Sequence, residues 1–151
     1  MALKPDRVEA YTDISFFMNE TGERGGVAVH STAGSGSAMD DANAVVEYAA
    51  DQSGTNPAGL LLCDVVDLDL TRQHINFHKD EVQKGSKVTL LRQGFVVTNM
   101  IVSGVTPSAG DPAYYGANGL LTTVSTNSTQ VGRWLSAKDS DGYAKVDINI
   151  T

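Results

Sequence analysis

The pattern of apolar and polar positions is most regular at the C-terminal end of the chain. Between residues 143 and 150, the apolar side chains of Val146, Ile148 and Ile150 alternate with polar ones. A period of two is typical of a strand that buries one face. We therefore expect a strand over 143–150 with these three side chains in the core and Trp134 packed nearby.

The rest of the second half of the chain predicts further strands separated by turns. Asn118-Gly119 and Asp141-Gly142 are typical of type I′ turns, in which both central residues need a positive φ. Gln93-Gly94 is expected to be a turn between two strands. The strands predicted in this half lie at 87–92, 95–98, 113–115, 120–124 and 130–138.

The first half of the chain is less regular. A glycine-rich turn is expected over Gly22–Gly26, flexible or turn-rich loops over 31–38 and 51–59, and an extended connection, with or without one short strand, over 67–81. Residues 45–50 fit a short helix capped by Asp40 or Asp41, or a strand, because Val45 and Val46 are β-branched; we favour the strand. The remaining predicted strands are 14–18, 27–30 and 60–66.

Many short strands bounded by Gly, Pro and Asn predict a mostly β protein, either a small antiparallel barrel or a sandwich with long loops. A chain of 151 residues is close to the size of one domain. We expect a single β domain over 14–151. Residues 1–13 are polar and contain Pro5, and we expect them to form an extended N-terminal arm.

The charge of the chain argues against two classes of partner. The net charge is −7, which disfavours binding to the phosphates of nucleic acids and to anionic membrane surfaces. No apolar run approaches the ~20 residues of a membrane span, and no signal peptide is predicted. We expect no nucleic acid and no membrane as partners, and synthesis in a cytoplasm.

Candidate metal ligands do not form a recognisable site. His74 and His78 stand about 13 Å apart if their segment is a strand. The sequence Asp139-Ser140-Asp141-Gly142 begins like a calcium loop, but position 12 is Ile150 instead of glutamate. Cys63 has no CxxC partner and is expected to be a buried apolar side chain. We predict no metal and no cofactor.

Catalytic motifs are also lacking, so we predict that the protein is not an enzyme and has no catalytic residues. A cluster of carboxylates is a candidate for glycoside hydrolysis, but a solvated polar surface is the favoured interpretation. An aromatic cluster near the C-terminal hairpins is suited either to the core or to stacking on sugars and interfaces, and the core is favoured. The carboxylates are Asp64, Asp67, Asp69, Asp80 and Glu81, and the aromatics are Tyr114, Tyr115, Trp134 and Tyr143.

One resemblance covers residues 84–150. Its segments are Lys84-Gly85-Ser86-Lys87-Val88-Thr89, Gly110-Asp111-Pro112-Ala113-Tyr114, Asn118-Gly119-Leu120-Leu121-Thr122-Thr123, Val131-Gly132-Arg133-Trp134-Leu135, Asp141-Gly142-Tyr143 and Ala144-Lys145-Val146-Asp147-Ile148. In this order and spacing, the sequence resembles the head-decoration (cement) proteins of tailed bacteriophages.

The resemblance implies a structural virion protein that binds the outer surface of a phage capsid and stabilises the shell, with synthesis in the host cytoplasm. It implies the major capsid protein as partner and self-association, as a homotrimer in first place or a dimer. The arm is then free to pair with a neighbour's strand edge. The alternative function is a virion-surface β module that recognises a host glycan or receptor. Candidate contacts with capsid or subunit are Leu3, Pro5, Arg7, Tyr11, Tyr114 and Tyr115.

Overall fold

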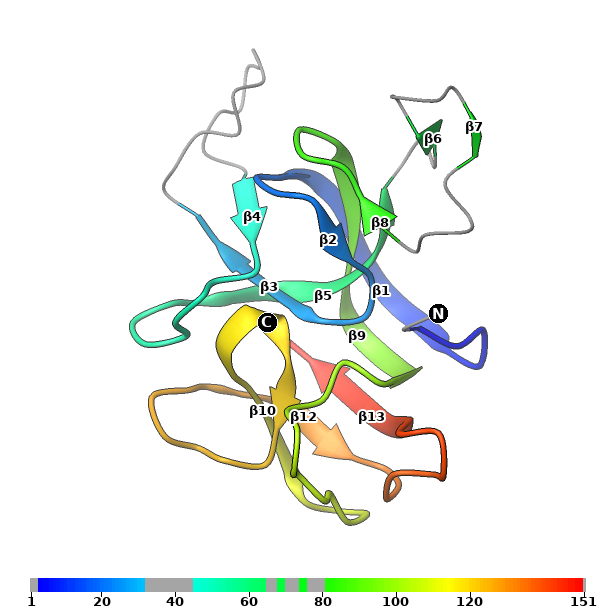
Figure 1. The fold of residues 1–151 in the computed structure, drawn as a ribbon, viewed down its shortest axis with the longest axis vertical. Coiled ribbons are helices and arrows are strands. Elements are labelled where there is room, and N and C mark those ends of the chain that lie inside the picture. The colour runs from blue at the N-terminus through cyan, green and yellow to red at the C-terminus, as the bar shows by residue number, and fades with distance from the viewer. Residues whose placement is uncertain (1–2, 32–44, 65–67, 70–73, 76–80, 151) are drawn as a thin grey trace.

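The computed structural model describes residues 3–31, 45–64, 68–69, 74–75 and 81–150. These residues are mostly in strands, as predicted (Figure 1). In chain order the elements are β1 (Val8–Met18), β2 (Gly22–Glu23), β3 (Val27–His30), β4 (Val45–Glu47), β5 (Pro57–Asp64), β6 (Leu68–Asp69), β7 (His74–Ile75), β8 (Glu81–Val82), β9 (Lys87–Thr98), β10 (Pro112–Tyr115), the 3-10 turn η1 (Ala117–Gly119), β11 (Leu121–Thr122), β12 (Gln130–Trp134) and β13 (Ala144–Asn149).

Nine of these strands form one sheet in the order β1-β4-β3-β5-β9-β13-β12-β10-β11. Because β1 also pairs with β9, the strands β1, β4, β3, β5 and β9 close into a ring of pairings, which we call the closed ring. The strands β13, β12, β10 and β11 continue from the second half of β9 as the open sheet, seen in the lower part of Figure 1. The pairs β2–β8 and β6–β7 are separate two-stranded ribbons.

Strand β9 connects the two regions. Its first half pairs with β5 from Val88 to Leu91, and its second half pairs with β13 from Gln93 to Thr98. The turn predicted at Gln93-Gly94 is wrong, because the strand runs through it. Gly94 has a φ of 144°, and a Cβ there would collide with the carbonyl oxygen of Val8. The glycine therefore permits the close approach of β1 to a continuous strand.

The two faces of β5 and β9 enter different cores. Leu61 and Leu90 belong to a cluster within the closed ring, whereas Leu60 and Leu91 belong to a larger cluster that continues under the open sheet. Burial on both faces explains the continuous apolar run of β5. The larger core contains Val146, Ile148, Ile150 and Trp134, which confirms the predicted inward face of the last strand.

The two predicted type I′ turns have different outcomes. Asn118 and Gly119 both have positive φ, 59° and 76°, as predicted. Asp141 does not have a positive φ, so the second prediction is wrong. The Asp139 carboxylate accepts hydrogen bonds from the backbone N–H of Asp141 and Tyr143, both at 2.9 Å. This side-chain bonding stabilises a different turn, and the preceding strand ends at Trp134 instead of 138.

The N-terminal segment differs from the predicted arm in one respect. Residues 8–13, assigned to the arm from the sequence, lie in β1 and pair with β9 of the same chain. Leu3 is 5% exposed and forms a bridge with Thr98. The expected strand at 14–18 therefore starts six residues earlier. The cause is backbone pairing with β9, which the polar side chains of residues 8–13 do not predict.

Several of the remaining sequence predictions fall on described residues and can be compared with the structure. Residues 45–47 are a strand, as favoured over a helix. The extended connection includes two strands of two residues each, β6 and β7. Most of the flexible loop at 31–38 lies outside the described residues, as do His78, the side chain of Cys63 and the side chains of the carboxylate cluster.

Candidate functional site

The open sheet has one buried side and one side free of covering elements in the described chain. Along β13 the buried residues alternate with Lys145, Asp147 and Asn149, which point to the other side. We call the surface formed by these residues and their cross-strand neighbours the outer face. Cross-strand neighbours share a face, so the strand register defines its composition.

Two rows of side chains cross the outer face. One row contains cross-strand neighbours from five strands. The other row also contains residues from β1 at one end to β10 at the other, all on the same side of the sheet. The first row is Val8, Phe95, Asp147, Arg133 and Pro112. The second consists of Tyr11, Gln93 and Asn149, with Gln130 and Tyr114 paired further along.

Apolar side chains on the outer face lie near its margins. Val8 is 50% exposed and Tyr11 is 53% exposed, while Phe95 and Tyr114 are half-buried. Isolated exposed apolar residues are ordinary on a protein surface. Here two of them lie on one strand and share a sheet surface with further aromatic rings, which is typical of a protein contact.

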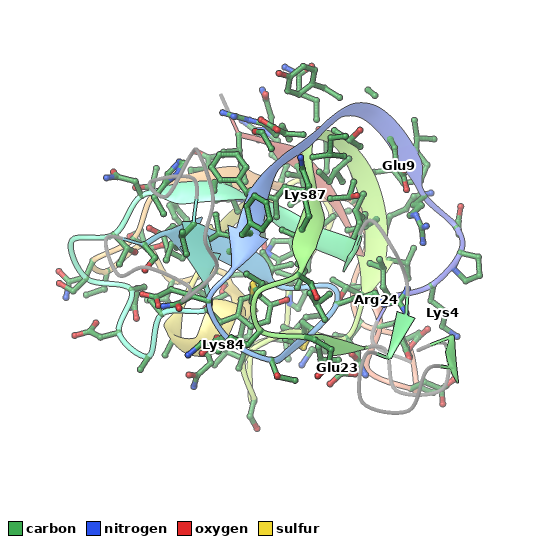
Figure 2. The ribbon with its side chains drawn as sticks, turned by 90° about the horizontal axis from the view of Figure 1, so that it is seen from above. Lys4, Glu9, Glu23, Arg24, Lys84 and Lys87 are labelled. Carbon is green, nitrogen blue, oxygen red and sulfur yellow. The ribbon has the colours of Figure 1, made fainter. Side chains whose placement is uncertain are left out.

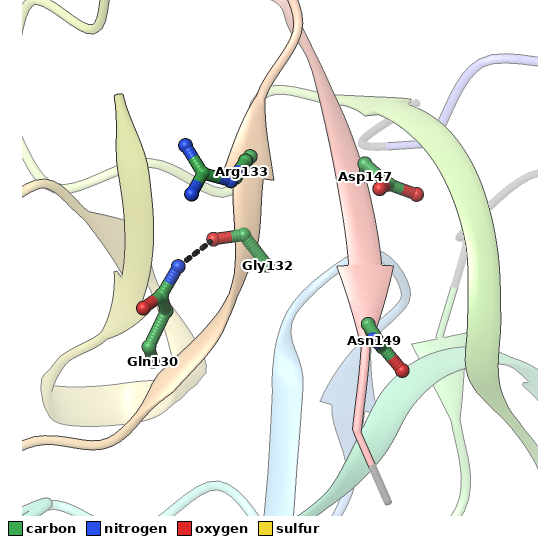
Figure 3. Close-up of a pocket in the computed structure, with 5 residues that line it drawn as sticks. All are labelled: Gln130, Gly132, Arg133, Asp147 and Asn149. Carbon is green, nitrogen blue, oxygen red and sulfur yellow. Dashed lines mark hydrogen bonds between the residues drawn. The ribbon is translucent and has the colours of Figure 1, made fainter. Parts of the chain in front are cut away.

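A shallow hollow of about 250 Å³ lies in the middle of the outer face (Figure 3). The Gln130 side chain donates a hydrogen bond to the Gly132 carbonyl at 3.0 Å. The Arg133 guanidinium donates to the Gly110 carbonyl at 3.2 Å. Asp147 and Asn149 also line the hollow. Their carboxylate and amide are therefore placed to bind a polar group of a partner.

Cations on and around the outer face are held against carboxylates and aromatic rings. Lys145 Nζ lies 4.1 Å from the centre of the Phe95 ring and 3.8 Å from an Asp6 carboxylate oxygen. Lys4 Nζ lies 4.4 Å from the centre of the Tyr143 ring. Each cation–π contact contributes about 0.5–1 kcal/mol at exposed sites. These contacts fasten the N-terminal segment to the open sheet.

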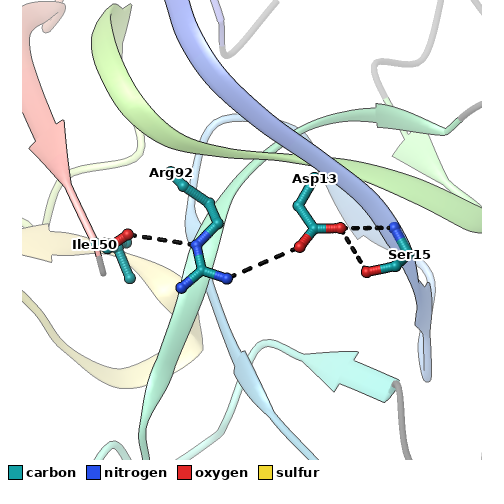
Figure 4. Close-up of polar contacts among 4 residues, drawn as sticks. All are labelled: Asp13, Ser15, Arg92 and Ile150. Atoms are coloured by element: carbon teal, nitrogen blue, oxygen red, sulfur yellow. Dashed lines mark hydrogen bonds and ion pairs between the residues drawn. The ribbon is translucent and has the colours of Figure 1, made fainter.

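A polar bridge links β1 to the end of β13 (Figure 4). Arg92 Nε donates to the Ile150 carbonyl at 3.3 Å, and its terminal nitrogen lies 3.8 Å from the Asp13 carboxylate. Burial raises the pKa of Asp13, but hydrogen bonds from the Ser15 hydroxyl and amide, with the charge of Arg92, bring it below its ordinary value. Burial and the same guanidinium lower the pKa of His30.

The residues predicted as contacts fall into two groups. Leu3 and Tyr115 are buried within the chain, and the Tyr115 hydroxyl donates to the Thr55 carbonyl at 2.9 Å. Their side chains are therefore used by the fold. Pro5, Arg7 and Tyr11 are exposed, and Tyr114 is half-buried. The structure brings Tyr11 and Tyr114, 103 positions apart in the sequence, onto the same outer face.

Sequence reasoning missed Phe95, Arg133 and Asp147 as members of this surface. The sequence predicts Asp147 on the polar side of the last strand, and this alternation is the one feature of the sequence that points to its place on the surface. The cross-strand register that places it beside Phe95 has no local signature, because β9 is distant in sequence from β13. Its pairing with Arg133 depends on the turn between β12 and β13, which differs from the predicted type I′ turn.

Within the described residues there is no group of three His, Cys, Asp or Glu side chains placed to hold a metal ion. The described chain also has no helix with the length and apolar character needed to cross a membrane. The aromatic cluster is mostly internal: Trp134 and Tyr115 are buried, while Tyr114 and Tyr143 are half-buried.

Comparison with known proteins identifies the family. The model of the structural cement protein family (E217 gp24/Pam3 gp6) matches residues 6–149, which is nearly the whole chain. The chain belongs to this phage cement protein family. It is therefore a structural protein of the phage head with a capsid-stabilising role, located at the capsid, as the sequence resemblance implied.

The cement protein also resembles a solved structure. Among solved structures, it is similar to the head fiber gp8.5 N base of bacteriophage phi29, at 14% sequence identity and a TM-score of 0.48. This similarity covers 95% of the cement protein and 94% of the other chain. No curated protein matches the sequence.

Proposed function

We propose that the cement protein binds the major capsid protein at the outer surface of the shell, and that the outer face of the open sheet makes this contact. The observation that supports the proposal most strongly is the shared orientation of Val8, Phe95 and Tyr114, on the side of the sheet opposite the core. A contact of standard size needs about 800 Å² from each partner. Contact through this face needs no rearrangement of the core, because its side chains already point away from it.

Mass action explains how such a contact stabilises a shell. A protein that binds assembled capsomers but not separated ones shifts the equilibrium towards the assembled state. This role needs no catalytic residue, in agreement with the structural character of the family. Stabilisation should therefore increase with the concentration of cement protein until the sites are full.

The test uses capsids that lack the cement protein, mixed with purified full-length chain and pelleted by centrifugation. We expect the natural sequence to pellet with capsids and Arg133→Glu to bind at least about tenfold more weakly, a loss of about 1.4 kcal/mol. Thr21→Glu is the matched control, since Thr21 is exposed in the turn between β1 and β2. Equal binding of Arg133→Glu and Thr21→Glu would exclude the outer face as the contact.

We also propose that the protein self-associates, as a trimer in first place and as a two-fold dimer otherwise. Closed cyclic symmetry is usual for homo-oligomers, and local three-fold axes of a shell suit a trimer. Light scattering should give a small multiple of 16.0 kDa. A mass of one chain at all concentrations, in the presence of normal capsid binding, would exclude self-association in solution.

Residues 3–7 are the described part of the predicted arm that precedes β1, and Leu3 forms a bridge with Thr98 of β9. We propose that exposed Pro5 and Arg7 contribute to assembly, whereas Leu3 anchors the segment in the core. Changing Arg7 to Glu should weaken capsid binding without altering the melting temperature. Unchanged binding would restrict the segment to its role in the fold.

A second candidate function rests on the polar hollow. The carboxylate of Asp147 and the amides of Asn149 and Gln130 are suited to hydrogen bonds with the hydroxyls of a host glycan. Screening the protein against bacterial surface glycans tests this candidate. Binding that is lost in Asp147→Ala would establish a receptor role alongside capsid binding, and no binding to any glycan would leave the capsid role alone.

A further inference from the structure

Strand β1 is paired along only one edge for most of its length. It pairs with β9 between Val8 and Phe17, and with β4 only at Phe17 and Met18. No strand of the described chain pairs with its other edge over residues 8–16. Figure 2 shows β1 as a blue ribbon that arches along the outside of the molecule, with Glu9 beside it.

This edge is unusual within the nine-stranded sheet. Among the described strands, β3, β4, β5, β10, β12 and β13 each have two neighbours, β9 has three, and the terminal strand β11 has two residues. A long free edge is a template for pairing with another chain, and proteins commonly protect it with Lys or Pro. The middle of β1 has neither.

The side chains of the free edge are those of a contact surface. Val8, Tyr11 and Ile14 are each at least 50% exposed, and they account for three of the five large apolar side chains exposed in the described chain. The sequence places Ile14 at the start of a strand, where a core position would be expected. Three exposed apolar side chains on one strand are more than isolated exposure, and such a grouping is typical of an interaction site.

We infer that the free edge of β1, over residues 8–16, accepts an extended segment of the capsid shell protein as an additional strand. This inference rests on the proposed binding to the major capsid protein and specifies how part of that binding occurs. In strand addition, backbone hydrogen bonds provide affinity, and alternate side chains provide specificity. From the sequence, the N-terminal arm was expected to add to the strand edge of a neighbour. In this inference residues 8–13 instead provide the edge, and the partner provides the added strand.

Charge favours a foreign strand as the occupant. Residues 6–18 contain three carboxylates, of Asp6, Glu9 and Asp13, and one cation, Arg7, within a chain of net charge −7. An incoming strand that carries Lys or Arg is attracted to this segment. A second copy of β1 would bring the same excess of negative charge and would place carboxylates near carboxylates.

Symmetry leads to the same occupant. A trimer requires two different complementary surfaces on each subunit, whereas an edge that pairs with its own copy gives a two-fold dimer. The described sheet has one long free edge, so edge-to-edge pairing cannot close a three-fold ring. In the proposed trimer, the edge of β1 is left for the shell.

The edge is held in place before a partner binds. The Arg92 bridge joins Asp13 to the carbonyl of Ile150 (Figure 4), and Arg7 Nε lies 2.6 Å from the Glu9 carboxylate. Gly94 allows the backbone of β1 to lie close against β9. A strand ordered in this way loses little conformational entropy on binding, which increases affinity.

The experiment compares the natural chain with Ile14→Lys and Val124→Lys in capsid pelleting and in light scattering. The two residues are 53% and 54% exposed, and Val124 lies outside β1. We expect Ile14→Lys to bind capsids at least about tenfold more weakly, and Val124→Lys to bind within about twofold of the natural chain. Amide exchange in residues 8–16 should slow when the natural chain binds capsids.

Each alternative outcome has a separate meaning. If the natural chain binds capsids and Ile14→Lys binds equally well, the inference is wrong and the proposed function stands. If the natural chain fails to bind capsids, the proposed function itself fails. If Ile14→Lys converts an oligomer to a single chain without capsids present, the edge pairs with a second copy, and the capsid strand is excluded.

Discussion

The closed ring and the open sheet share strand β9 but differ in what they leave exposed. In the closed ring, pairing returns from β9 to β1, and its inner residues Met18, Leu61 and Leu90 are fully buried. In the open sheet, one side covers the larger core, while the other presents Asp147, Arg133 and Tyr114. The ring satisfies its own hydrogen bonds over most of its circumference, and the sheet leaves a whole surface for partners.

This difference indicates that one region of the chain provides rigid support and the other provides the contact surface. A closed set of strands removes edges and gives rigidity, whereas an open antiparallel sheet tolerates one solvated face. The free edge of β1 is the exception within the ring, and it lies beside the outer face through the pair Val8–Phe95. Rigid support and contact surface therefore meet along β9 and β1.

The largest expected effect comes from opening a cavity in the core of the open sheet. Ile148 is 1% exposed and lies opposite Gly94 of β9. Ile148→Ala should lower the free energy of unfolding by about 2–5 kcal/mol, measured by denaturant unfolding. Asn149→Ala, on the exposed side of the same strand, should change it by less than about 0.5 kcal/mol. Similar values for both variants would contradict the assigned faces.

The next effect tests the junction between the two regions. Gly94→Ala places a Cβ against the Val8 carbonyl at a residue with a φ of 144°. Backbone strain of this kind costs on the order of 1–3 kcal/mol. Gly116→Ala is the control, because its nearest contacts are at ordinary distances. If the two variants melt at the same temperature, the close approach of β1 to β9 is incorrect.

An effect of similar size is expected at Tyr48, which lies where the ring meets η1 of the open sheet. Its hydroxyl donates to the Glu23 carbonyl and accepts from the Gly26 N–H at 3.2 Å, and its ring packs against Gly119. Burial raises the pKa of this phenol, so it stays protonated. Tyr48→Phe should cost about 1–3 kcal/mol because two buried backbone groups lose a partner. A melting temperature unchanged from the natural chain would contradict this.

The smallest effect concerns pH. The folded-state pKa of His30 lies below its ordinary value of 6.5, and that of Asp13 lies below 3.8. Each group therefore contributes stability above its ordinary pKa, which is lost as the pH falls through the folded value. Between pH 7 and pH 5 the natural chain should lose more unfolding free energy than His30→Gln. Parallel pH profiles would show that His30 titrates as in the unfolded chain.

The sequence predicts the open sheet better than the closed ring, and the reason is physical. Strand β13 alternates because only one of its faces is buried, and Asn118-Gly119 needs two positive φ values. Strands of the ring lack such local signals. The first part of β1 is polar and is extended only because β9 lies beside it, and Leu60–Leu62 are buried on both faces and therefore do not alternate.

The candidate site was likewise predicted where local patterns determine it and missed where it depends on strand pairing. Tyr11 and Tyr114 are candidate contacts predicted from the sequence, and both lie on the outer face. Tyr115 was selected with them, but the alternation of β10 directs it into the core. The pairing of Phe95 with Asp147 depends on the register of two strands far apart in the chain, and that of Asp147 with Arg133 depends on a turn other than the predicted one; composition and spacing determine neither.

The capsid-stabilising role is tested most directly by the thermal stability of capsids that lack the cement protein, measured with increasing amounts of the purified full-length chain. If the protein binds the assembled shell, the disruption temperature of the capsid should rise with concentration and reach a plateau, as ligand linkage requires. Arg133→Glu should need about tenfold more protein for the same rise. A disruption temperature that stays constant at saturating concentrations of the natural chain would contradict the capsid-stabilising role.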